Sequence, residues 1–280
     1  MDCKTVVITG GTSGIGEVAA RSLAELGARI VLVARDQSRA DASLARLRKT
    51  APGLAHRAHL ADLTQLAEMK RVAARIAAEE PRIDVLLNNA GALFASRQVT
   101  PDGLERTFAL NHMSYFVVTQ ALRERLVASA PARIVSTASG AHQGASLDFN
   151  DLQSEKDYGA MKAYSRSKLA NILFTRELAR RLGGTGITVN CLHPGFVATR
   201  FGDESGGMMS RLVRLAKIFA ISPAEGAKTI VYLASSPEVA GITGEYFHKC
   251  RVTQPSSAAR DDKAARLLWE RSAALAGMKP

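Results

Sequence analysis

Short β-branched segments alternate with longer amphipathic segments along most of the chain, and this alternation limits the fold more than any other feature. Strands that alternate with helices form right-handed βαβ units, in which the strands lie parallel and helices cover both faces of the sheet. Segment 29–34 is apolar almost throughout, as expected for a strand covered on both faces. The sequence therefore predicts an α/β fold with a doubly wound, mostly or wholly parallel sheet of seven strands.

The limits of these elements follow from the hydrophobic period and from the glycines and prolines that end each run. We expect strands at 6–8, 29–34, 55–60, 84–88, 132–136, 187–192 and 245–247, and helices around 18–26, 44–47, 64–80, 104–126 and 160–182. No linker or internal repeat divides the 280 residues, which indicates one domain with a helical tail near 256–276.

The net charge of +11 does not by itself indicate nucleic-acid binding. The basic residues are spread along the chain, no run of five like charges occurs, and only 5% of the residues are aromatic. A platform for stacked bases needs aromatic side chains interleaved with basic ones, so we expect no nucleic-acid partner. A diffuse positive field would instead attract a phosphorylated cofactor.

Several protein classes are excluded by what the chain does not contain. No eighteen consecutive apolar residues occur, and the N-terminus leads directly into a strand, so neither a membrane span nor a signal peptide is predicted. Cys3, Cys191 and Cys250 are odd in number and far apart, which argues against disulfides. This cysteine usage fits a reducing compartment, so we expect a cytoplasmic protein. The six histidines lack metal-ligand spacing, so we expect no metal site.

A glycine-rich segment, 9–16 (TGGTSGIG), lies between the first strand and the first helix. Glycines there permit a tight turn, close approach of a pyrophosphate to backbone N–H groups, and an anion at the helix N-terminus. The spacing is Gly-x₃-Gly-x-Gly from Gly10, which differs from the common G-x-G-x-x-G pattern. The alternative is a purely structural turn, but the position after the first strand favours a dinucleotide site in a Rossmann-type domain.

The same segment resembles the TGxxxGIG cofactor loop of the short-chain dehydrogenase/reductases. Further motifs follow in that family's order: Asn88–Gly91 (NNAG), Asn111, Ser139, Tyr164-x-x-x-Lys168, and His193-Pro194-Gly195 with Thr199. Segments 150–153, 167–175 and 265–269 are similar to the retinol dehydrogenase-like branch. Members of that branch commonly carry an N-terminal membrane anchor; we expect this protein to have none and to be recovered in the soluble fraction.

Tyr164 and Lys168 are four residues apart on a predicted helix, so their side chains lie on one face. Lowering a phenol pKa from about 10 to about 7 requires roughly 4 kcal/mol. An ammonium group some 4 Å away supplies about that much at an effective dielectric constant near 20. A surface pair is the alternative for such spacing alone, but the accompanying motifs favour an acid/base role with the pKa of Tyr164 near 7.

The family resemblance implies a role for each motif residue. Tyr164 would exchange a proton with the substrate oxygen, and Lys168 would lower the pKa of Tyr164 and bind the nicotinamide ribose. Ser139, rather than Ser136, would bind the carbonyl oxygen, and Asn111 would hold a water relay. The expected cofactor contacts are Gly10, Thr12, Ser13, Gly14, Ile15, Gly16, Arg35, Asp62, Leu63, Asn89, Ala90, Gly91, Tyr164, Lys168, Pro194, Gly195, Val197 and Thr199.

The end of the second strand indicates which cofactor is preferred. In NAD-preferring relatives an acidic residue occupies the position that is Ala34 here, and Arg35 is placed to meet a 2′-phosphate. We therefore expect NADP(H). Asp36 lies about twenty residues after the glycine loop and could bind ribose hydroxyls instead, so NAD(H) remains the alternative. Asp62 is expected at the adenine ring.

The substrate class is predicted from the apolar composition of one segment and from Phe94. Met208, Met209 and several aliphatic residues crowd the segment near 200–221, where the family has its substrate lid. Together with Phe94 they predict a bulky apolar aldehyde, ketone or alcohol; plain core or a homo-oligomer contact is the alternative. We expect an oxidoreductase, with a cofactor-binding sensor or scaffold as the second hypothesis. His142 is expected on a solvated loop, or else against the substrate.

Overall fold

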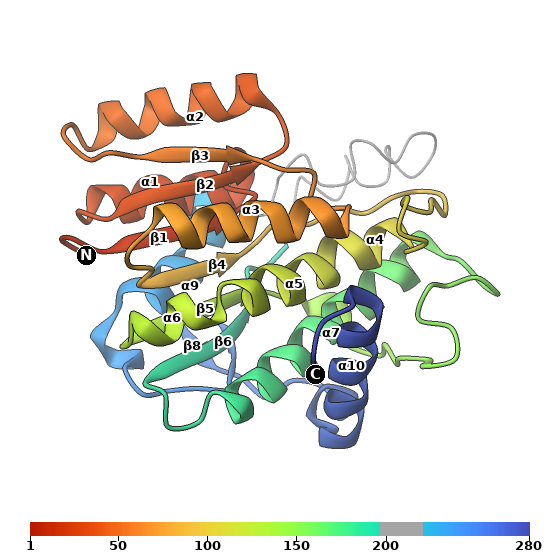
Figure 1. The fold of residues 1–280 in the computed structure, drawn as a ribbon. Coiled ribbons are helices and arrows are strands. Elements are labelled where there is room, and N and C mark those ends of the chain that lie inside the picture. Colours follow the sequence, from red (N-terminus) through yellow and green to blue (C-terminus); the bar gives the residue numbers. More distant parts are fainter. Residues whose placement is uncertain (197–220) are drawn as a thin grey trace.

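The computed structural model describes residues 1–196 and 221–280 and shows an eight-stranded sheet with helices on both faces (Figure 1). The strand order is β3-β2-β1-β4-β5-β6-β7-β8. The sheet is parallel up to β7, and β8 pairs antiparallel with β7. The strands are β1 Thr5–Thr9, β2 Arg29–Ala34, β3 Arg57–Leu60, β4 Val85–Asn88, β5 Ala132–Thr137, β6 Ile187–His193, β7 Tyr246–His248 and β8 Arg251–Val252.

This arrangement confirms the predicted doubly wound α/β domain and adds one strand. The expected seven strands are all present, but β8 contains only two residues, both exposed, and has no apolar pattern that sequence reasoning could detect. The larger helices are α1 Gly14–Glu25, α2 Gln37–Thr50, α3 Leu66–Glu79, α7 Ala160–Arg181, α9 Pro223–Ser235 and α10 Asp262–Ala276. The predicted tail therefore contains α10, preceded by a short 3₁₀ turn, Ala258–Arg260.

Alternate residues of each strand pack into separate cores on the two faces of the sheet. Val6 and Ile8 of β1 belong to the core built with α1 and α9, whereas Val7 faces α3 and α5 (Ser114–Ala121). Trp269 of α10 extends the second core, because it packs edge-on against Phe116 with ring centroids 5.0 Å apart. Both faces of the sheet are thus covered by apolar side chains, which explains why β1, β2 and β4 are mostly apolar.

The single helix expected at 104–126 is instead divided into four parts. They are α4 Arg106–Phe108, a π turn η1 Ala109–Met113, α5 Ser114–Ala121 and α6 Arg123–Ala128. A π turn inserts one extra residue into the helical ladder and is frequent at functional sites. The helical hydrophobic period continues through the segment, so nothing in the pattern marks the interruption. It also lies on Asn111, one of the predicted site residues.

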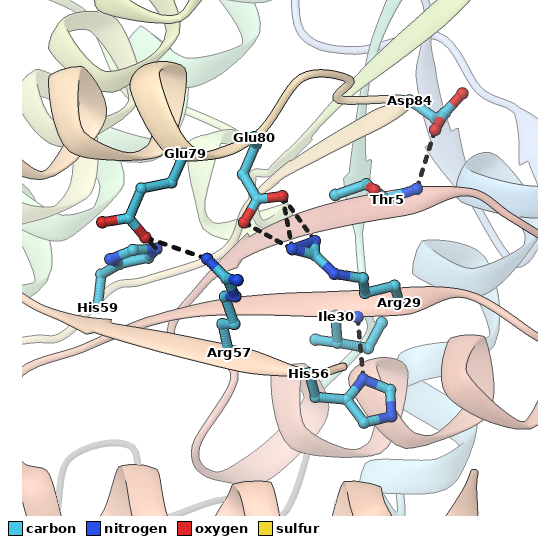
Figure 2. Close-up of polar contacts among 9 residues, drawn as sticks. All are labelled: Thr5, Arg29, Ile30, His56, Arg57, His59, Glu79, Glu80 and Asp84. Carbon is cyan, nitrogen blue, oxygen red and sulfur yellow. Dashed lines mark hydrogen bonds and ion pairs between the residues drawn. The ribbon is translucent and has the colours of Figure 1, made fainter. Parts of the chain in front are cut away.

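Charged residues and histidines lie at the ends of β1, β2 and β3 where these strands begin, and Figure 2 shows them. Arg29 at the start of β2 donates from both terminal nitrogens to the buried carboxylate of Glu80, at 2.6 and 2.8 Å. Next to Arg29, the backbone N–H of Ile30 donates to His56 Nδ1 at 3.0 Å. Nδ1 must be unprotonated to accept this hydrogen bond, so the His56 ring is neutral. This edge is structural, and the predicted site residues lie at the opposite edge.

Buried neutral histidines should make the protein acid-sensitive. Burial lowers the pKa of His56 and His59, and lowers that of His112, which is fully buried in the π turn, to about 4. An unfolded histidine binds its proton near pH 6.5, so the unfolded state is protonated first as the pH falls. The stabilisation is therefore complete above pH 6.5 and is lost toward pH 4. His112 alone should lower the free energy of unfolding by about 2 kcal/mol at pH 5.

Denaturant unfolding at pH 7.5 and pH 5.0 measures this difference, and His112→Asn should reduce it. An equal pH dependence in the variant and in the wild type would show that His112 does not contribute.

Candidate active site

Four neighbouring strands bring the predicted motifs to one edge of the sheet. β1, β4, β5 and β6 are adjacent and parallel, so the segments that follow them meet at their carboxyl ends. The glycine loop follows β1, Asn89 follows β4, Ser139 follows β5 and Pro194 follows β6. Ligands of open α/β sheets bind in this crevice. The topology therefore assembles motifs that are more than 180 residues apart in sequence, such as Gly10 and Pro194.

The glycine loop has the close packing that a pyrophosphate site needs. Gly10 has φ 68° and Gly14 φ 56°, both in the left-handed region. A Cβ on Gly16 would lie 2.3 Å from the carbonyl oxygen of Gly10, and a Cβ on Gly10 would lie 2.8 Å from the Cα of Ala90. Ser13 precedes the first turn of α1 and its side chain forms no cap, so it does not occupy the backbone N–H groups of this turn.

Thr9, Asn89 and Thr137 join the glycine loop to the ends of β4 and β5. Thr9 Oγ1 accepts the N–H groups of Asn89 and Ala90 at 3.0 and 3.1 Å. The amide of Asn89 donates to the carbonyl of Gly10 at 3.1 Å and accepts from Thr137 Oγ1 at 3.2 Å. Sequence reasoning did not identify Thr9 or Thr137, although Thr9 stands in the glycine motif itself.

Asn111 is fully buried in the π turn and its amide is fixed on both sides. Oδ1 accepts the N–H of Ala92 and Nδ2 donates to the carbonyl of Ala92, both at 2.9 Å. Nδ2 also donates to Ser167 Oγ at 3.0 Å. Asn111 therefore ties the chain after Gly91 to α7, and a Cβ on Gly91 would lie 3.2 Å from Asn111 Oδ1 and 3.4 Å from Lys168 Nζ.

Tyr164 and Lys168 lie on one face of α7, as predicted. Lys168 is buried, with 3% of its surface exposed, and its Nζ donates to the carbonyl of Thr137 at 2.9 Å. Nζ lies 5.6 Å from the centre of the Tyr164 ring and 5.7 Å from that of Tyr115. The ammonium group thus lies between two phenols at the end of β5.

The predicted pKa of Tyr164 near 7 is wrong for this structure. Burial raises the pKa of Tyr164 to about 12, although a hydrogen bond with the Ser139 side chain lowers it in part. Burial also lowers the pKa of Lys168 to about 7. The earlier argument counted the attraction between the charged forms but not the loss of hydration, which penalises both of them. At neutral pH Tyr164 is therefore protonated.

Ser139, unlike Ser136, is placed beside Tyr164. Ser139 ends the extended segment after β5, is half-buried and accepts the N–H of Ala141 at 3.1 Å. Ser136 is fully buried within β5. His142 is neither solvated nor turned toward a substrate: it is buried, its Nδ1 lies 2.7 Å from the Ser139 carbonyl and its Nε2 accepts the N–H of Ser256 at 3.2 Å. Both expectations for His142 are therefore wrong.

The remaining predicted cofactor residues lie around the same edge. Pro194 and Gly195 follow β6, and the N–H of Gly195 donates to His193 Nδ1 at 3.3 Å. Val197, Thr199 and most of the expected lid near 200–221 fall outside the described residues. Asp62 precedes the buried Leu63, and its Oδ1 accepts the N–H and hydroxyl of Thr64 at 3.0 and 2.9 Å.

Arg35 and Asp36 differ in what they contact. Arg35 is exposed directly after β2, where it is available to a ligand. Asp36 is the N-cap of α2, because its carboxylate accepts the N–H of Arg39 at 2.8 Å. A capping carboxylate is held at the helix start, which argues against Asp36 as the ribose ligand.

Comparison with known families agrees with this geometry. The short chain dehydrogenase family model matches residues 4–209. The chain belongs to this family of oxidoreductases. Retinol dehydrogenase 14 of Homo sapiens is 42% identical over 294 residues, covering 99% of this chain and 88% of that protein. Retinol dehydrogenase 13 of Homo sapiens is 40% identical, with 99% of this chain and 85% of that protein covered. The retinol dehydrogenase-like resemblance is thus confirmed.

Solved structures share the fold. An uncharacterised protein from Mycobacterium paratuberculosis superposes with a TM-score of 0.80 at 30% identity, covering 99% of this chain and 95% of that one. A short chain dehydrogenase from Burkholderia cenocepacia in complex with NADP has a TM-score of 0.71 at 29% identity, with 88% and 96% covered. Among the described residues, no helix is long and apolar enough to span a membrane, and no three histidine, cysteine or acidic side chains form a metal-binding group.

Proposed function

We propose that the protein is an NADP(H)-dependent oxidoreductase that interconverts an apolar aldehyde or ketone and its alcohol. The observation that carries this proposal is the group formed by Ser139, Tyr164 and Lys168 beside the glycine loop. Ser139 hydrogen-bonds Tyr164, and Lys168 lies within 5.6 Å of the same ring. A cofactor-binding sensor would need the loop but not this group.

Each member of the group has a distinct task in the proposed reaction. The bound nicotinamide supplies or takes up the hydride. Tyr164, protonated at neutral pH, donates a proton to the substrate oxygen during reduction. The ammonium form of Lys168, whose Nζ lies 5.6 Å from the centre of the Tyr164 ring, stabilises the phenolate that remains by charge attraction. Ser139 holds the substrate oxygen next to Tyr164 and stabilises its developing charge.

Two further parts of the site would serve the cofactor. The glycine loop and the first turn of α1, from Gly10 to Gly16, would hold the pyrophosphate, since a Cβ on Gly16 would collide with the loop. Gly91 leaves the side of Lys168 open toward the expected nicotinamide ribose, because a Cβ there would lie 3.4 Å from Nζ. Pro194, Gly195, Asp62 and Leu63 are proposed to complete this site, with Val197 and Thr199.

NADP(H) is favoured over NAD(H) by charge at the end of β2. Ala34 offers no carboxylate to the ribose hydroxyls, Arg35 is exposed, and the carboxylate of Asp36 is used in capping α2. An NADP complex is also known for the similar Burkholderia cenocepacia enzyme. A 2′-phosphate would therefore be attracted by the guanidinium of Arg35, with no free carboxylate at the end of β2 to repel it.

An apolar substrate is favoured by exposed apolar side chains that lie next to two of the site motifs in the chain. Met161 is half exposed one turn before Tyr164 on the same face of α7, and Phe196 is 55% exposed directly after Gly195. Phe94, in contrast, is buried beneath the guanidinium of Arg106, 4.3 Å from its ring centre. Similar proteins are named retinol dehydrogenases, which fits a bulky apolar substrate. The cytoplasmic location, the lid role of 200–221 and a homo-oligomer stay predictions of the sequence.

Steady-state reduction of a homologous series of aldehydes with NADPH tests the proposal. Each additional buried methylene contributes about 0.8 kcal/mol, so kcat/KM should rise about fourfold per carbon until the pocket is full. Charged keto acids and sugars should react poorly. A kcat/KM that is flat along the series, or highest for a charged substrate, contradicts an apolar pocket. Absence of turnover with all carbonyls, together with tight NADPH binding, would favour the sensor hypothesis.

A further inference from the structure

Asn171 lies on α7, three residues after Lys168, and its side chain bridges two backbone carbonyls. The residue is fully buried. Its Nδ2 donates to the carbonyl of Asn111 at 2.9 Å and to the carbonyl of Thr137 at 3.4 Å. These carbonyls belong to the π turn and to the end of β5. One amide group therefore connects two separate elements of the site, using both of its hydrogens.

The carbonyl of Thr137 determines where the Lys168 ammonium lies. It accepts Lys168 Nζ at 2.9 Å, and the hydroxyl of Tyr115 also points to it, at 3.5 Å. The titratable groups that face Lys168 are Tyr115 of α5 and Tyr164 of α7. Any displacement of this carbonyl would move the ammonium relative to Tyr164 or leave it without an acceptor in a buried position, which is costly.

The carbonyl of Asn111 lies inside the π turn and accepts a tertiary hydrogen bond there. A π turn is a rare departure from the regular α-helical hydrogen bonds, so a tertiary contact within it helps to fix its geometry. The Asn171 amide supplies such a contact inside η1. It thereby supports the turn from which the Asn111 side chain reaches Ala92, and so the chain that leads away from Gly91.

The Asn171 side chain also interacts with His112 of the π turn. This interaction raises the pKa of His112, although the larger effect of burial lowers it. On its other side His112 Nε2 lies 2.8 Å from Ser272 Oγ of α10. Asn171 thus contacts the π turn and the end of β5 directly, whereas α10 reaches this region only through His112.

We propose that Asn171 is a positioning residue for the proposed reaction: its amide clamps the Thr137 carbonyl that holds the Lys168 ammonium and the Asn111 carbonyl of the π turn. This inference rests on the proposed function of Lys168. A measurement on Lys168 that needs no turnover separates the two, because it reports the clamp even if no carbonyl substrate is ever reduced.

The test is the pKa of Lys168 by NMR in protein labelled with ¹³C at lysine Cε. The Lys168 signal is identified by its absence from the Lys168→Met variant. Asn171→Leu is similar in size, removes both donors and makes the surroundings of Lys168 more apolar. We expect it to lower the pKa of Lys168 by about half a unit or more, since the Thr137 carbonyl that accepts from the ammonium is no longer held in place and the ammonium is further desolvated. An unchanged or raised pKa overturns the proposal.

Asn190→Leu is the matched control. Asn190 is also a buried amide that bridges two backbone groups, the carbonyl of Ile242 at 2.7 Å and the N–H of Glu245 at 3.1 Å. It lies on β6 between Cys191, which packs against α7, and Val189, so its own side chain faces away from α7. We expect lower stability but no change in the pKa of Lys168. An equal shift in both variants also overturns the proposal.

Asn171→Ser covers the case in which Asn171→Leu does not fold. Serine is small enough to be accommodated and has a single donor, so it cannot bridge both carbonyls. The same direction of shift is expected, with kcat lowered about tenfold and the KM for NADPH little changed. A wild-type pKa of Lys168 together with a wild-type kcat in this variant contradicts a positioning role.

Discussion

Tyr164→Phe is expected to lower kcat by about 10²- to 10⁴-fold, the range that a positioned proton donor contributes. Only the hydroxyl is removed, and the ring still covers the Lys168 ammonium at 5.6 Å. Cofactor affinity should therefore change little. Steady-state kinetics with an apolar aldehyde, combined with fluorescence titration of NADPH, measure the two quantities separately.

Tyr158→Phe provides the matched control. The Tyr158 hydroxyl donates to the carbonyl of Phe94 at 2.7 Å, so this variant also loses one hydrogen-bonded phenol hydroxyl from the same region. It should retain most of the turnover. If Tyr164→Phe kept turnover within about tenfold of the wild type, Tyr164 would not be the proton donor.

The parallel core of this fold could be predicted because β1, β2 and β4 are almost continuous apolar runs. The predicted and observed limits of β2 coincide at Arg29 and Ala34, since glycine and charged residues border that run. β8 could not be found, because Arg251 and Val252 are exposed and follow a turn in which Lys249 and Cys250 have positive φ. A two-residue edge strand has no periodicity to detect.

The division of the helix at 104–126 depends on tertiary contacts that the hydrophobic pattern does not contain. Asn111 reaches Ala92, and the Asn171 amide reaches the Asn111 carbonyl. Residues brought from 19 and 60 positions away thus stabilise the π turn, whereas the local sequence remains compatible with a regular helix. Helix propensity predicts an element, but a bulge within it is decided by its neighbours.

In the site, the side chains that carry the chemistry could be predicted, whereas their backbone partners and their burial could not. The motif residues Ser139, Tyr164 and Lys168 could be identified because their side chains carry the chemistry. The acceptor of Lys168 is a backbone carbonyl, at Thr137, which no residue type specifies. The pKa values of Tyr164 and Lys168 depend on burial, which spacing along a helix does not determine. Burial likewise could not be predicted for His142, which lies inside the fold and contacts the backbone carbonyl of Ser139.

Arg35→Ala is expected to lower the preference for NADPH over NADH, measured as the ratio of the two kcat/KM values, by roughly 10- to 100-fold. A charge-assisted hydrogen bond to a phosphate contributes about 1.5 to 3 kcal/mol, and NADH has no 2′-phosphate to lose it. The kcat/KM for NADH should therefore stay nearly constant while that for NADPH falls. Because the contact is an exposed ion pair, the preference of the wild type should also decline with salt.

Two controls separate this contact from the general field of a protein with a net charge of +11. Arg48→Ala removes an equal charge from the exposed far end of α2 and should weaken NADPH binding only slightly. Asp36→Asn keeps a side chain able to cap α2 but removes the carboxylate. If Asp36 binds ribose hydroxyls, this variant loses activity with NADH; if it only caps the helix, both cofactors are used as before. An unchanged cofactor ratio in Arg35→Ala, or an equal loss in Arg48→Ala, would place the selectivity elsewhere than at the end of β2.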